Sequence, residues 1–208
     1  LVILLTTNKI FAKDNKIQYA EEDISNYFLG IISANQSYNK EAFRYLKKVQ
    51  SIKNKHSQFN VEFIRTNVLL GKFKQAFAFS ENTWNENELF FETDLLLGLD
   101  SFIKKDYIRA ERYFKRLNKI SQYNLIFDNF FGNVLMAWTR ALQGNKVASF
   151  EFLEKIPRPY NHLKSTQNIF LQCYFDSNNT QKSLEELISN PNYIFSRYNF
   201  FLANYLLH

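Results

Sequence analysis

A repeat of 34 residues constrains this sequence more strongly than any other feature. Three similar segments each carry an alanine at the same place, and these alanines, Ala42, Ala76 and Ala110, are 34 residues apart. The same offset, taken twice, relates Leu29 to Leu97. Self-similarity at a period of this length is typical of solenoids, in which one small structural unit is stacked on copies of itself.

Each unit is predicted to be a pair of helices joined by a tight turn. In the third unit, we expect one helix from Leu95 to Lys104 and a second from Tyr107 to Asn118. The apolar residues of the second helix fall on one helical face. They are Tyr107, Ala110, Tyr113, Phe114 and Leu117. Only 5 Gly and 3 Pro occur among 208 residues, too few turn residues for a β-sandwich or barrel.

Two further copies are offset from the first three. Ala148 follows Ala110 by 38 residues, which predicts an insertion of about one helical turn around Gln122 to Asp128. A weaker fifth copy has Ser183, 35 residues after Ala148, in place of the alanine. The last apolar stretch, Tyr198 to Leu207, predicts the first helix of a sixth unit.

This pattern resembles the tetratricopeptide repeat family. The family repeat has 34 residues, a large and then a small residue in its first helix, and an alanine early in its second. Leu29-Gly30 and Leu97-Gly98 match the first signature, and the resemblance extends from Asp23 to roughly Arg197. It implies an all-α, right-handed superhelical solenoid of antiparallel helix pairs with about five to six repeats. The family's first-helix aromatic residue is missing at Asn26.

We expect one repeat array over residues 23–208, preceded by an N-terminal segment, 1–22. The expected units are 23–56, 57–90, 91–124, 129–162 and 164–197, followed by a single helix at 198–208. The apolar run Leu1 to Leu5 is either a signal-peptide remnant, cleaved near Ala12, or an apolar helix or frayed chain end. The first alternative predicts a periplasmic or exported protein, and the second a cytoplasmic one. Because both ends lie in apolar stretches, we expect a longer native chain.

The resemblance implies that the first helices line a concave groove that binds a partner protein or peptide. The groove residues it implies are Tyr27, Ile31, Arg65, Leu95, Leu99, Phe102, Asn133, Arg140, Asn168 and Gln172. Such a mixture of apolar, amide and cationic groups suits a peptide with apolar anchors and acidic ends. The alternative for each residue is that it packs between units.

A row of basic residues along the expected second helix of unit three is the second candidate surface. Lys105, Arg109, Arg112, Arg116 and Lys119 are spaced by four, three, four and three residues, which places them on one face. This basic stripe would dock an acidic protein, RNA or an anionic membrane. Otherwise it is the solvated outer face of the helix. The formal net charge of +6 fits either interpretation, and nucleic acid and membrane remain the less favoured partners.

No constellation in the sequence predicts catalysis, a cofactor or a metal. The histidines His56, His162 and His208 are far apart, and Cys173 is the single cysteine, so no metal-ligand spacing occurs. Cys173 lies in an apolar helix and is expected to be buried. The chain is therefore predicted to be a protein-binding scaffold and not an enzyme.

Overall fold

The computed structural model describes residues 20–53, 56–121, 129–191 and 197–207. Within these ranges every regular element is a helix. The α-helices are α1 (Glu21–Asn35), α2 (Asn39–Leu46), α3 (Ser57–Leu69), α4 (Phe73–Thr83), α5 (Phe91–Ile103), α6 (Tyr107–Ser121), α7 (Phe130–Leu142), α8 (Lys146–Glu154), α9 (Asn161–Tyr174), α10 (Thr180–Ser189) and α11 (Arg197–Leu207). Short 3-10 helices lie at Lys47–Ile52 and Arg158–Tyr160.

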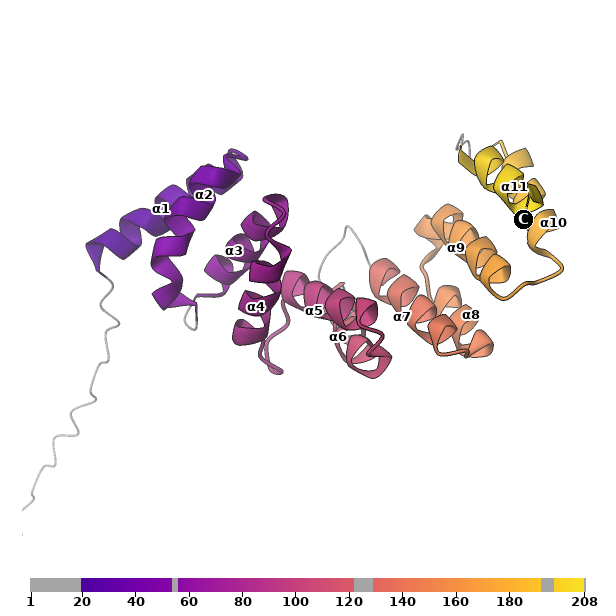
Figure 1. The fold of residues 1–208 in the computed structure, drawn as a ribbon, viewed down its shortest axis with the longest axis horizontal. Coiled ribbons are helices and arrows are strands. Elements are labelled where there is room, and N and C mark those ends of the chain that lie inside the picture. Colours follow the sequence, from indigo (N-terminus) through magenta and orange to yellow (C-terminus); the bar gives the residue numbers. More distant parts are fainter. Residues whose placement is uncertain (1–19, 54–55, 122–128, 192–196, 208) are drawn as a thin grey trace, which may run out of the picture.

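Consecutive helices form pairs, and each pair packs on the next along the chain (Figure 1). The pairs are α1 with α2, α3 with α4, α5 with α6, α7 with α8, and α9 with α10, while α11 packs on the last pair. The array is elongated and curved, and its hollow side faces upward in Figure 1, where α5 and α7 lie nearer the hollow than α6 and α8. The predicted all-helical repeat solenoid is confirmed.

Small residues allow the two helices of a pair to approach closely. Ala42, Ala76 and Ala110 are completely buried, as expected for the small positions of the second helices. On the facing first helix, a Cβ atom at Gly98 would lie 2.3 Å from the ring of Phe114. A larger side chain at either position would therefore push the pair apart.

The turn inside each pair has one left-handed residue, which closes the first helix. These residues are Ser37, Gly71, Lys105, Gly144 and Asp176, with φ between 50° and 77°. In each turn the amide after this residue donates to a carbonyl five residues earlier, as from Asp106 to Ser101 at 2.9 Å. This is the Schellman arrangement that satisfies otherwise unpaired helix-end carbonyls. The turns provide a register for all five pairs.

This register corrects the expected alignment of units four and five. Gly144 follows Lys105 by 39 residues, so the offset is one residue longer than predicted. Accordingly, Ser149 is completely buried, whereas Ala148 is only half-buried. In unit five, Thr180 is buried and Ser183 is half-buried. The predicted insertion at 122–128 and most of the N-terminal segment, residues 1–19, lie outside the described residues.

Substitutions in the turns should separate backbone strain from packing. Nothing lies within 4 Å of a Cβ atom built at Gly71, so Gly71→Ala carries only the cost of a left-handed residue with a side chain. We expect a loss of roughly 1–2 kcal/mol in the free energy of unfolding. Lys105→Gly removes the strain of a left-handed residue with a side chain and should raise the free energy of unfolding by about 0.5–1 kcal/mol. Urea unfolding of both variants measures these changes.

Gly144→Ala is the matched control, because that position also has no atom near its added Cβ. It should cost as much as Gly71→Ala. Unchanged stability of both alanine variants would show that these turns do not hold the left-handed conformation.

Candidate functional site: the concave face of the first helices

One face of the first helices points away from their paired second helices. Three positions of each first helix share this face, namely those two, six and thirteen residues before the left-handed turn residue. They are spaced by four and seven residues, about one and two helical turns. Apolar side chains fill most of these positions. They are Ile24, Ile31, Leu69, Leu99, Ile103, Phe131, Trp138, Leu142, Leu163, Phe170 and Tyr174, and we call them the concave row.

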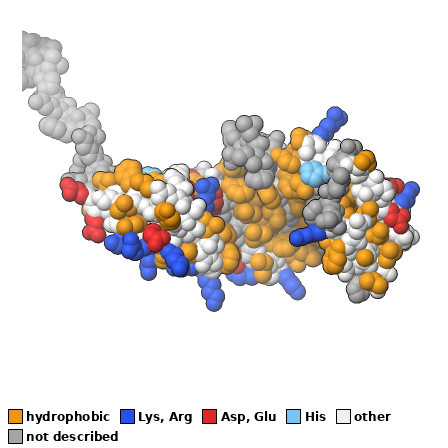
Figure 2. Space-filling model, turned by 90° about the horizontal axis from the view of Figure 1, so that it is seen from above, with side chains coloured by type: hydrophobic (Ala, Val, Ile, Leu, Met, Phe, Trp, Pro, Cys, Tyr) orange, Lys and Arg blue, Asp and Glu red, His pale blue; other side chains and the backbone are white. Residues whose placement is uncertain are grey.

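The concave row lies on the hollow side of the array. Figure 2 looks down on this side and shows hydrophobic side chains gathered over the middle of the molecule. Leu69 is 67% exposed and Ile103 is 73% exposed, and the two occupy the same position in successive units. An apolar strip of this kind is a candidate surface for another protein.

The groove residues predicted in units one to three follow this register. Ile31 and Leu99 belong to the concave row, and Tyr27, Leu95 and Phe102 flank it on the same helices. All five are half-buried. Their aliphatic and aromatic surfaces are thus shared between the core and the hollow side. Their role in binding a partner stays a prediction.

The groove residues predicted in units four and five do not follow this register. The extra residue before α7 turns each position by about 100°, so Asn133 points inward, is buried, and donates to the Lys155 carbonyl at 3.3 Å. Asn168 and Gln172 bond to each other at 2.8 Å and line a separate pocket between α9 and α10. Aligning Gly144 with Gly71 would have revealed this shift from the sequence alone.

Both predicted groove arginines are bound to acidic residues of the chain. Arg65 lies on the hollow face but pairs with Glu92 of the next unit at 2.6 Å and with Glu62 at 3.2 Å. Arg140 pairs with Glu111 of the preceding unit at 2.8 Å. These arginines join neighbouring units, and the groove therefore lacks the two free cations that the sequence had suggested.

Two apolar pockets lie toward the ends of the concave row. At the N-terminal end, Tyr27 lines a pocket of about 180 Å³ with Ile24 and Phe28. Burial raises the Tyr27 pKa, and the nearby Glu62 carboxylate raises it further. At the other end, α9, α10 and α11 line a pocket of about 440 Å³. Its lining includes Phe170, Cys173, Phe200, Phe201 and Tyr205.

The basic stripe on α6 is not a continuous exposed surface. Arg109 pairs with Glu81 at 3.5 Å, and Arg112 pairs with Glu86 at 3.1 Å. Arg116 is buried, which contradicts its expected place in the stripe. Lys105 and Lys119 remain exposed at the two ends of the helix. Carboxylates of the preceding unit engage Arg109 and Arg112, and the loop between α4 and α5 covers Arg116.

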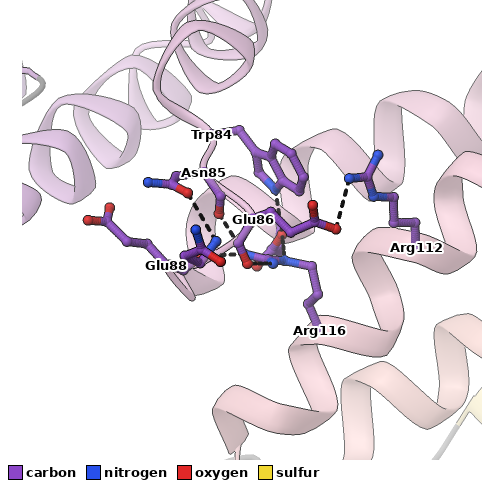
Figure 3. A network of polar contacts seen from close by, with 8 residues as sticks. Trp84, Asn85, Glu86, Glu88, Arg112 and Arg116 are labelled. Carbon is purple, nitrogen blue, oxygen red and sulfur yellow. Dashed lines mark hydrogen bonds and ion pairs between the residues drawn. The ribbon is translucent and has the colours of Figure 1, made fainter.

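Arg116 holds the loop between α4 and α5 (Figure 3). Its guanidinium donates to Asp94 Oδ1 at 2.8 Å, to the Glu86 carbonyl at 2.6 Å and to the Asn85 carbonyl at 3.1 Å. It also donates to the Glu88 carbonyl. Three backbone carbonyls of this loop thus accept hydrogen bonds from one side chain, which assigns Arg116 a structural role.

Trp84 completes this network. Its indole N–H donates to Asp94 Oδ1 at 3.1 Å, and the guanidinium carbons of Arg112 and Arg116 lie 4.7 and 5.1 Å from the Trp84 ring centre. Burial raises the pKa of Asp94, although the hydrogen bonds from Arg116 and Trp84 act in the opposite direction. The network is held by buried charges and is sensitive to the loss of either one.

Within the described residues, no group of three or more His, Cys, Asp or Glu is placed to hold a metal ion. Cys173 is exposed, contrary to the burial expected from its apolar helix, because it belongs to the face of α9 that opens into the pocket beside α11. Of the helices described, none is long and apolar enough to cross a membrane.

Comparison with known proteins supports the fold. No family model and no curated protein sequence matches this chain. Among solved structures, PilW, described as a widely conserved type IV pilus biogenesis factor, matches 86% of this chain and 82% of its own, with a TM-score of 0.60 and 14% identity. At this identity, the similarity concerns the arrangement of helices, a tetratricopeptide-like helical repeat.

Replacing Arg116 should be far more costly than replacing its neighbour on the stripe. The side chains of Arg116 and Asp94 are 10% and 1% exposed. Arg116→Ala leaves a buried carboxylate unpaired, and we expect a loss of roughly 3–5 kcal/mol in the free energy of unfolding. Arg112→Ala, one turn away and exposed, should cost less than about 1 kcal/mol. Equal losses in urea unfolding would contradict the structural role of Arg116.

The loss in Arg116→Ala should also depend on pH. Without Arg116, the pKa of Asp94 rises further, because a partner that lowered it is gone. A carboxyl with a higher pKa in the folded state favours folding at acid pH and loses that contribution as the pH rises through its folded pKa. The deficit should therefore shrink as the pH falls from neutral toward the usual pKa of aspartate. Urea unfolding of the variant and of wild type across this pH range measures how the difference in the free energy of unfolding changes with pH.

Proposed function

We propose that this protein is a scaffold that binds a segment of another protein along the concave row. The observation that carries the proposal is the exposure of Leu69 and Ile103 at equivalent positions of successive units. Regularly spaced apolar groups on a hollow surface suit a partner segment that presents large side chains at a matching repeat.

The chemistry of the face favours apolar anchors over charged ones. Arg65 and Arg140 are engaged by carboxylates of the chain, so we no longer expect acidic ends on the partner to be its main contacts. The pocket between α9 and α11 has room for one or two large apolar side chains. The preferred partner is therefore an amphipathic helix or an extended segment rich in Leu, Ile or Phe.

The structural neighbour is consistent with a protein partner. PilW is described as a biogenesis factor for type IV pili, and assembly of a fibre involves contacts among proteins. We carry over only this general class of role. The alternative, a basic adaptor that acts through the stripe on α6, loses support because carboxylates of the chain engage Arg109, Arg112 and Arg116.

Selection from a random peptide library tests the proposal without a known partner. The wild-type protein should enrich peptides with two or more large apolar residues. Leu69→Asp combined with Ile103→Asp should lower the affinity for the selected peptides by tenfold or more, because each carboxylate would be desolvated on binding. Dissociation constants measured by fluorescence anisotropy give the comparison.

Ile108→Asp combined with Val147→Asp is the matched control. These side chains are 84% and 70% exposed, but they belong to second helices and lie outside the concave row. The control should bind the selected peptides like wild type. Equal weakening in both double variants would place binding elsewhere, as would enrichment of peptides without apolar residues.

A further inference from the structure

The first two units carry a group of basic side chains that the sequence pattern did not single out. These residues are Lys40, Arg44, Lys47, Lys48, Lys72 and Lys74, and we call them the N-terminal cationic patch. All six are exposed. No ion pair to any of them occurs among the described residues, whereas the three arginines of α6 all have carboxylate partners.

A contact within the patch links the two units. Lys40, Arg44 and Lys47 are spaced by four and three residues, so they follow one side of α2 and the start of the 3-10 helix after it. The ring of Phe43, on the same side, joins this row to the next unit. Lys72 Nζ lies 3.4 Å from the ring centre, and Lys47 Nζ lies 6.0 Å from it. Figure 2 shows Lys and Arg side chains gathered along one edge of the N-terminal part, with an acidic side chain among them.

Two exposed aromatic side chains lie beside these cations in the chain. Tyr38 immediately precedes α2, and Phe73 is the first residue of α4, between Lys72 and Lys74. The two rings occupy the turns of successive pairs, next to the basic ends of both second helices. The surface therefore combines unpaired positive charge with protruding aromatic groups.

We infer that the N-terminal cationic patch binds the surface of an anionic lipid bilayer. Five of its six cations are lysines, whose compact charges act as point charges, whereas arginine provides the fork that recognises single carboxylates or phosphates. A dispersed array of lysines fits a dispersed negative surface. Tyr38 and Phe73 suit the boundary between head groups and acyl chains. The concave row would remain free for a protein partner.

Vesicle co-sedimentation tests this inference. Wild-type protein should sediment with phosphatidylglycerol-containing vesicles at low salt and not with pure phosphatidylcholine vesicles. Lys48→Glu combined with Lys74→Glu changes one exposed cation in each unit. One cation near an anionic surface contributes about fivefold in partitioning, so reversing two should lower the partition coefficient by about 25-fold or more.

Lys105→Glu combined with Lys119→Glu is the control, because it changes the net charge equally at the ends of α6. It should retain most of the binding. Circular dichroism checks folding, and Lys48→Gln with Lys74→Gln replaces any patch variant that does not fold. Equal binding to neutral vesicles, or equal losses in the patch and control variants, would overturn the inference. Capture of duplex DNA without binding to vesicles would assign the patch to nucleic acid instead.

Discussion

The turn inside each helix pair determines how the whole array is organised. A left-handed residue ends every described first helix that leads into a second one, and the same Schellman hydrogen bond forms in each of these turns. Because this turn recurs, the same face of each first helix meets its partner and the opposite face reaches the hollow side. Two of the five turns use glycine, while Ser37, Lys105 and Asp176 adopt the strained conformation with a side chain. Packing of the following helix must offset that strain.

The buried small positions of the first three second helices were predicted correctly because their signals are local and repeat without interruption. Ala42, Ala76 and Ala110 are buried as expected, and a helical face depends only on spacing. The fourth unit was misaligned by one residue because alanine was taken as the marker, whereas Ser149 occupies the buried small position. A single residue turns a helix by about 100°, which was enough to move Asn133 from the expected groove into the interior.

Spacing also failed to identify which charges are free. The five basic residues of α6 do share a face, but the residues that cover it come from 22 to 31 positions earlier in the chain. A periodic pattern contains no information about a loop that folds back across it. The buried Arg116 and the exposed Arg112 look equivalent in sequence, and only the path of the loop between α4 and α5 distinguishes them.

The same reasoning explains where unpaired charge remains. In units two to four, arginines reach carboxylates of a neighbouring unit, as Arg65 reaches Glu92 and Arg140 reaches Glu111. These pairs strengthen the contact between neighbouring units, the only units that touch in a solenoid. The basic residues of α2 and of the 3-10 helix after it meet no such carboxylate among the described residues, and Lys72 instead covers the Phe43 ring. Arginines that pair with a neighbouring unit are therefore poorly placed to bind a partner. Basic residues without a carboxylate partner in the array are free to contact an external anionic surface. The array thus has an apolar hollow face and a separate basic edge, two surfaces with different chemistry, and we propose a different ligand for each.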